Sequence, residues 1–197
     1  APDGKRIFFL SKRPLRRGEP LSDRENIWYA ERTGDAWGEP KYLGDEVNSL
    51  SVHWQVSADL EGNLYFGGQD PDGKTMRDIF VSRHNAGTYL KPEKLDPTVS
   101  SAGLEHSPFI AADGSYLIFS RASQQRTQLG IFISFKTKEG RWGEAVCLND
   151  IIGCPAATQC TYVTHDGKYL FYISWGSSNW ASYWIRSDFI EKLRPKD

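Results

Sequence analysis

Residues 113–119 read Asp-Gly-Ser-Tyr-Leu-Ile-Phe, a tight-turn pair followed directly by an apolar run. The same arrangement begins at Asp3, Glu61 and Asp166, so successive copies are 58, 52 and 53 residues apart. An Asp-Gly pair suits a hairpin turn because glycine tolerates positive φ. Each copy therefore predicts a hairpin whose second strand is the apolar run.

A second landmark, an apolar triplet, recurs every 52 residues, since 79−27, 131−79 and 183−131 all give this number. Its copies are Ile27-Trp28-Tyr29, Ile79-Phe80-Val81, Ile131-Phe132-Ile133 and Tyr183-Trp184-Ile185. A third landmark, an aromatic residue close to a turn, occurs at Trp37, Tyr89 and Trp142. Three landmarks in register indicate internal repeats within one domain, at about 1–50, 51–103, 104–156 and 157–197.

Each repeat predicts four short antiparallel strands, namely one before the hairpin turn, one after it, one at the apolar triplet and one after a Gly-centred turn. A unit of this size cannot bury both faces of its sheet alone, and radial stacking of such sheets solves that problem. The expected fold is an all-β β-propeller of four-stranded antiparallel blades. The aromatic residues at Trp37 and Trp142 are expected to pack between neighbouring blades, because each occurs once per repeat.

The two end repeats are expected to be incomplete. The first opens at the turn before its second strand, and the last ends after its third. Asp188, with Glu191 three residues later, predicts a short helix there instead of a fourth strand. We therefore expect an incomplete ring, with a closed four-bladed ring as the alternative.

Composition excludes some function classes. The net charge of −1, from 24 Lys+Arg and 25 Asp+Glu, gives no electrostatic case for binding nucleic acid. No apolar run is long enough for membrane insertion. Cys154 and Cys160 could pair and leave Cys147 free, but three reduced thiols are the preferred interpretation, so the redox compartment stays open.

The repeat resembles a known family. The residues that carry the likeness are Ala1-Pro-Asp-Gly-Lys, Ile7-Phe-Phe, Trp37-Gly-Glu-Pro and the carboxyl-terminal stretch from Tyr183 to Pro195. They are similar to the TolB-like, WD-like β-propeller repeat, and the turns at Leu60-Glu61-Gly62 and His165-Asp166-Gly167 depart from its Pro-Asp-Gly pattern. The resemblance implies a bacterial binding module in the periplasm or outside the cell. It specifies function weakly.

Strand geometry predicts where a site would lie. The inner strand of each blade lines the channel of a propeller, so the starts of these strands ring its mouth. A spacing of 53 residues aligns His53, His106 and Gln159 there, with Trp54 and Glu105 beside them. Loops at the same face add further candidate ligand-binding residues, namely Arg13, Arg16, Arg17, Arg121, Arg126, Trp175, Asn179 and Trp180. His84 and His165 are expected to be surface residues.

Two functions follow. The preferred one is a non-catalytic module that binds a peptide, protein or saccharide at the channel mouth, because no nucleophile elbow, phosphate loop or Cys-x-x-Cys pair is present. An incomplete ring would also allow a homo-oligomer. The alternative is a metal-assisted lyase or hydrolase acting on an acidic saccharide. His53, His106 and Gln159 would then hold a divalent cation, and Glu105 would be the base.

Overall fold

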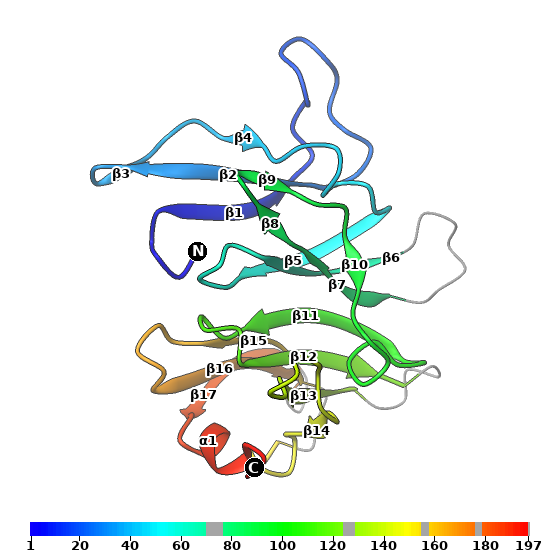
Figure 1. Ribbon diagram of the computed structural model, residues 1–197, viewed down its shortest axis with the longest axis vertical. Helices are drawn as coiled ribbons and strands as arrows, with labels where there is room; N and C mark the ends of the chain where they lie inside the picture. The colour runs from blue at the N-terminus through cyan, green and yellow to red at the C-terminus, as the bar shows by residue number, and fades with distance from the viewer. Residues whose placement is uncertain (70–76, 124–128, 155–157, 176–178, 197) are drawn as a thin grey trace.

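The computed structural model describes residues 1–69, 77–123, 129–154, 158–175 and 179–196, without the side chains of 52–54 and 158. It confirms the fold prediction: the chain is all-β, and four antiparallel sheets are arranged as propeller blades (Figure 1). The blades follow one another in sequence order, from β1 at one end to β17 at the other. Among the described residues, no helix has the length and apolarity needed to cross a membrane.

Blades 1 and 2 show how the repeat folds. Blade 1 holds β1 (Arg6–Ser11), β2 (Asn26–Thr33), β3 (Ala36–Trp37) and β4 (Lys41–Tyr42). Both β3 and β4 pair with β2, so β1 is the inner strand, and no strand lies inside it in the described chain. Blade 2 has the full order, with β5 (Val52–Ala58), β6 (Leu64–Gln69), β7 (Asp78–Ser82) and β10 (Glu93–Lys94) running from inside to outside. A hairpin of β8 (His84–Asn85) and β9 (Thr88–Tyr89) accompanies it.

Blade 3 is also complete, and blade 4 lacks its outer strand within the described residues. Blade 3 holds β11 (Leu104–Ile110), β12 (Tyr116–Ala122), β13 (Leu129–Phe135) and β14 (Val146–Cys147). Blade 4 holds β15 (Thr158–Val163), β16 (Tyr169–Trp175) and β17 (Trp180–Arg186) and is followed by α1 (Phe189–Leu193). The short helix was predicted, but the Asp188 carboxylate does not cap it and instead pairs with Arg186 at 2.7 Å.

Three inner strands share a β-bulge. In each, one non-glycine residue adopts positive φ, namely Gln55 at 35°, Ser107 at 52° and Cys160 at 55°. The ladder register shifts at the same points, between Trp54 and Val56, His106 and Phe109, and Gln159 and Tyr162. Positive φ is costly for such residues, so a feature that recurs in three blades is a built part of the fold.

The core consists of three clusters, one between each pair of neighbouring blades. Phe8 and Leu10 of blade 1 pack with buried Phe66 and Phe80 of blade 2. The cluster between blades 2 and 3 is centred on Tyr65, Val81, Leu117, Phe119 and Trp142, and that between blades 3 and 4 on Ile118, Ile133, Val163, Leu170 and Tyr172. Successive strand residues point to opposite faces, so each blade supplies one set of residues to each neighbour.

The two repeated tryptophans have different environments. Trp142 is 7 % exposed and packs against Tyr65 of the preceding blade, as predicted. Trp37 is 48 % exposed, so the prediction is wrong for this residue. The reason is positional, because Trp37 belongs to the first described blade and no other blade packs against that face within the described residues.

Candidate functional site

A cavity lies beside the inner strands. It has a volume of about 580 Å³ and is lined by β1, β5, β11, β15 and the turns that follow the inner strands. Its lining is mainly apolar and includes Ile7, Phe8, Val56, Leu60, Phe109, Ile110, Tyr116 and Val163. The Asp-Gly turn side contributes Asp113, His165 and Gly167. The cavity therefore lies along the second halves of the inner strands and not at their starts.

The cavity borders the open edge of blade 1. Its lining includes Ile7 and Phe8 of β1, whose partner among the described strands is β2 alone. The Ile27 carbonyl, which lies opposite Leu10, accepts the Leu43 amide on its far side. By the alternation of an antiparallel ladder, the backbone groups of Phe8 and Leu10 therefore point away from β2, toward the open edge. Blades 2 and 3 carry an inner strand at this position.

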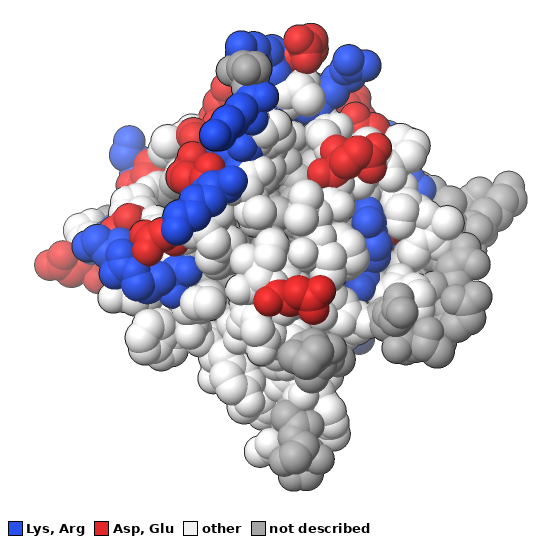
Figure 2. Space-filling view, turned by 90° about the horizontal axis from the view of Figure 1, so that it is seen from below, with Lys and Arg blue, Asp and Glu red and all other residues white. Residues whose placement is uncertain are grey.

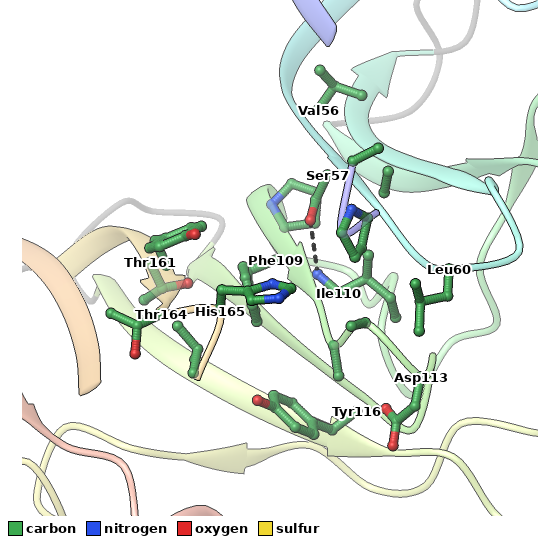
Figure 3. A pocket seen from close by; sticks show the side chains of 18 of the residues that line it. Val56, Ser57, Leu60, Phe109, Ile110, Asp113, Tyr116, Thr161, Thr164 and His165 are labelled. Carbon is green, nitrogen blue, oxygen red and sulfur yellow. Dashed lines mark hydrogen bonds between the residues drawn. The ribbon is translucent and has the colours of Figure 1, made fainter. Parts of the chain in front are cut away.

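The apolar lining of the cavity also contains a few polar groups. Thr161 is 1 % exposed, and its hydroxyl has no hydrogen-bond partner among the described residues. The Gln55 side-chain amide donates to the Thr161 carbonyl at 3.5 Å. Burial raises the pKa of Tyr116 to about 12, so its hydroxyl stays protonated. Figure 3 shows Thr161 and His165 on one side of the cavity and Asp113 on the other.

The predicted alignment of the channel-mouth residues needs a correction. The bulge residues Gln55, Ser107 and Cys160 mark the equivalent position in three blades, and the residues before them are Trp54, His106 and Gln159. His53 therefore aligns with Glu105 and not with His106. The error arises because the step from blade 2 to blade 3 is 52 residues, whereas the step from blade 3 to blade 4 is 53. The side chains of His53 and Trp54 lie outside the described part of the structure, as does the whole of Arg126.

His106 is a buried neutral histidine. It is 7 % exposed, and its Nδ1 lies 3.0 Å from the Ser107 hydroxyl. The hydroxyl in turn lies 3.6 Å from the Cys160 sulfur. Burial, aided by the positive charge of Arg77, lowers the pKa of His106 to about 4. Neutral imidazole is the form that ligates metals, but this ring is already enclosed by its neighbours.

The low pKa of His106 predicts acid sensitivity. Because this pKa is about 4 in the folded chain and 6.5 ordinarily, the neutral ring stabilises the fold fully above pH 6.5. That stability is lost as the pH falls from 6.5 toward 4, amounting to roughly 2–3 kcal/mol at pH 4.5. Urea unfolding at pH 7.5 and 4.5 should therefore show a smaller acid loss for His106→Gln than for the wild type. His165→Gln, at an exposed histidine, should behave as the wild type, and equal acid losses in all three proteins would contradict this assignment.

Glu105 and Arg121 form a buried ion pair and not a free base and a free cation. The Glu105 side chain is fully buried, and the Arg121 Nε donates to it at 2.8 Å. The Arg121 Nη2 also donates to the carbonyls of Thr98 and Val99, and its guanidinium lies over the rings of Phe119 and Phe132. Burial raises the pKa of Glu105, and Ser101 and Arg121 oppose that rise. The interpretation of Arg121 as a ligand-binding rim residue is therefore not supported.

The predicted aromatic residues of blade 4 do lie together. Trp175 and Trp180 face each other across β16 and β17, with ring centroids 5.4 Å apart. They are 44 % and 43 % exposed and lie at the end of the blade where Gln159 begins the inner strand. Their role as ligand contacts stays a prediction. Arg13, in contrast, is engaged within blade 1, where its guanidinium lies over Phe9 and Trp28.

No metal cluster accompanies these residues in the described chain. Among the described His, Cys, Asp and Glu side chains, no group of three or more could hold an ion. The cysteines are free thiols, so Cys154 and Cys160 are not joined. His84, predicted to be a surface residue, is half-buried beside Tyr89, whereas His165 is exposed as expected.

Comparison with known proteins supports the fold alone. No family model and no curated protein sequence matches the chain. Among solved structures, TolB from Acinetobacter baumannii superposes with a TM-score of 0.62 at 13 % identity, covering 95 % of this chain and 39 % of TolB. A prolyl endopeptidase structure superposes with a TM-score of 0.50 at 16 % identity, covering 93 % of this chain and 27 % of its own. The chain thus spans well under half the length of these proteins, and the TolB-like propeller scaffold is what the comparison establishes.

Proposed function

We propose that this protein is a non-catalytic binding module that holds an extended peptide segment of a protein partner in the cavity beside β1. The observation that carries the proposal is the coincidence of an apolar cavity of about 580 Å³ with the open edge of blade 1. A peptide in β conformation would add to that edge as the inner strand, with main-chain hydrogen bonds supplying affinity. Its apolar side chains would contact Leu60, Val56 and Phe109, and a polar group would meet the Thr161 hydroxyl.

The metal-assisted lyase is not favoured. Its nominated base, Glu105, is fully buried and held by Ser101 and Arg121. Substrate carboxylates would need free arginines, and Arg121 already contacts one carboxylate, two backbone carbonyls and two aromatic rings. The periplasmic or extracellular location is part of the proposal and rests on the TolB-like scaffold by analogy.

Strand addition predicts binding of a peptide that carries an inner-strand sequence. A fluorescein-labelled synthetic peptide with the sequence of residues 52–58 should bind the full chain with a Kd on the order of 10–100 μM, measured by fluorescence anisotropy. Leu60 lines the cavity and is 62 % exposed, so Leu60→Asp should weaken binding about 10-fold without unfolding the protein. Leu90→Asp, at a 44 % exposed leucine outside the cavity lining, is the matched control.

The backbone contribution has its own test. The same peptide with N-methylated amides cannot donate to β1 and should not bind, and the unmethylated peptide should slow the amide hydrogen exchange of Phe8 and Leu10. Equal binding of both peptides, or unchanged exchange at these two amides, would rule out strand addition. Equal affinities of the two leucine variants would rule out the cavity as the binding place.

A further inference from the structure

Blade 4 exposes a row of aromatic side chains across its sheet. Tyr162 lies opposite Phe171, and Phe171 lies opposite Trp184, so the three residues cross the blade at one level. Their exposed fractions are 54 %, 41 % and 62 %. Figure 2 views the molecule from the end that holds β17 and α1 and shows a broad surface of uncharged residues there.

The equivalent rows of the other blades are buried contacts with the following blade. In blade 3 the row that follows the bulge is Phe109, Ile118 and Ile133, and the two isoleucines are fully buried against blade 4. In blade 2 it is Ser57, Tyr65 and Val81, and the last two are 2 % exposed against blade 3. The aromatic row of blade 4 is therefore one half of a blade-to-blade interface.

Blade 1 exposes the other half of such an interface. Phe8 and Leu10 face blade 2, so by strand alternation Ile7 and Phe9 face the opposite way. Ile7 is 42 % exposed, and Trp37 is 48 % exposed. In blades 2 and 3 the positions of Ile7 and Phe9 hold the fully buried pairs Leu64 with Phe66 and Leu117 with Phe119.

One ring contact occurs at two of the three internal interfaces and matches these two exposed faces. Phe8 of blade 1 meets Tyr89 of blade 2 edge to face, with centroids 6.3 Å apart at 83°. Tyr65 of blade 2 meets Trp142 of blade 3 in the same way, at 6.4 Å and 87°. The position of Phe8 and Tyr65 is held by Ile118 in blade 3 and by Phe171 on the exposed row of blade 4. The position of Tyr89 and Trp142 is held by Trp37 on the exposed face of blade 1.

We propose that this chain binds a second copy of itself head to tail, with the Tyr162–Phe171–Trp184 row of one copy packed against Ile7, Phe9 and Trp37 of the next. The contact continues the interface geometry that the chain already builds between its own blades. It joins two different faces, so it is heterologous and leaves one face of each kind available at the ends of a linear dimer. The contact shares Ile7 and Tyr162 with the lining of the peptide cavity, whereas Phe171 and Trp37 lie outside that lining.

The test uses the full chain and two complementary variants. Sedimentation velocity over about 1–100 μM should show wild-type self-association, whereas Phe171→Glu and Trp37→Glu should each be monomeric. An equimolar mixture of the two variants should form a heterodimer, because each variant keeps the face that the other lacks. Leu90→Glu, at an exposed leucine on neither face, should associate as the wild type does.

Three outcomes would overturn the proposal. The first is a monomeric wild type at every concentration. The second is a Trp37→Glu protein that still dimerises, which would indicate contact between two blade 4 faces. The third is a mixture of the variants that stays monomeric. Circular dichroism of each variant shows whether its blades are folded, and both substituted residues are more than 40 % exposed, so the folds should be retained.

Discussion

Arg121→Met is expected to destabilise the fold by about 3–5 kcal/mol, because it leaves the Glu105 carboxylate buried without its counter-charge. The Glu105 side chain is fully buried, and its Oε2 has no hydrogen-bond partner among the described residues even in the intact pair. The substitution also removes the hydrogen bonds from Arg121 to the Thr98 and Val99 carbonyls, which join the end of β12 to the connection that precedes β11. Urea unfolding at pH 7.5 measures the loss.

Two comparisons separate the charge from the volume of the side chain. The double variant Glu105→Leu/Arg121→Met removes both charges and should recover most of the lost stability. Arg186→Met breaks an ion pair of similar length, 2.7 Å, but both partners are more than half exposed, so its effect should be below about 1 kcal/mol. A double variant no more stable than Arg121→Met would show that the buried charge is not the cause.

Trp142→Ala is expected to cost about 3–5 kcal/mol, since it removes a 7 % exposed ring from the cluster between blades 2 and 3. Trp37→Ala changes the same repeat position in blade 1, where the ring is 48 % exposed, and should cost less than about 1 kcal/mol. Both losses of stability are measured by thermal and urea unfolding at about 1 μM protein, a concentration low enough that self-association does not add to the measured stability. Similar losses in the two variants would contradict the explanation that a preceding blade decides burial.

The propeller could be predicted from the sequence because the residue patterns that specify its strands are local and repeated. Hairpin turns such as Asp113-Gly114 and the apolar triplets at fixed spacing report strand positions directly. The incomplete first repeat also followed from the order of these landmarks, and β1 is indeed the innermost strand of blade 1 among the described residues. The exposure of Trp37 did not follow, because burial at that position depends on a neighbouring blade and not on the residue itself.

The candidate site was less accessible to prediction. The bulges at Gln55, Ser107 and Cys160 decide which residues occupy equivalent positions in the three blades. The residue types at these bulges do not indicate positive φ, so the bulges could not be predicted from the sequence. A one-residue error therefore placed His53 beside His106. The pairing of Arg121 with Glu105 depends on side-chain direction across two strands, which spacing alone does not give. The cavity arises from four strands of different repeats, so only the assembled blades reveal it.

The stepwise arrangement of the three core clusters has a consequence for how the protein is made. Each cluster joins blades that are consecutive in the chain, and each blade is built from hairpins whose strands are close in sequence. A growing chain on the ribosome can therefore complete one blade and dock it onto the previous one before the next has been translated. The blades are then synthesised in the same order in which they pack, so most contacts between blades can form before the last blade is made.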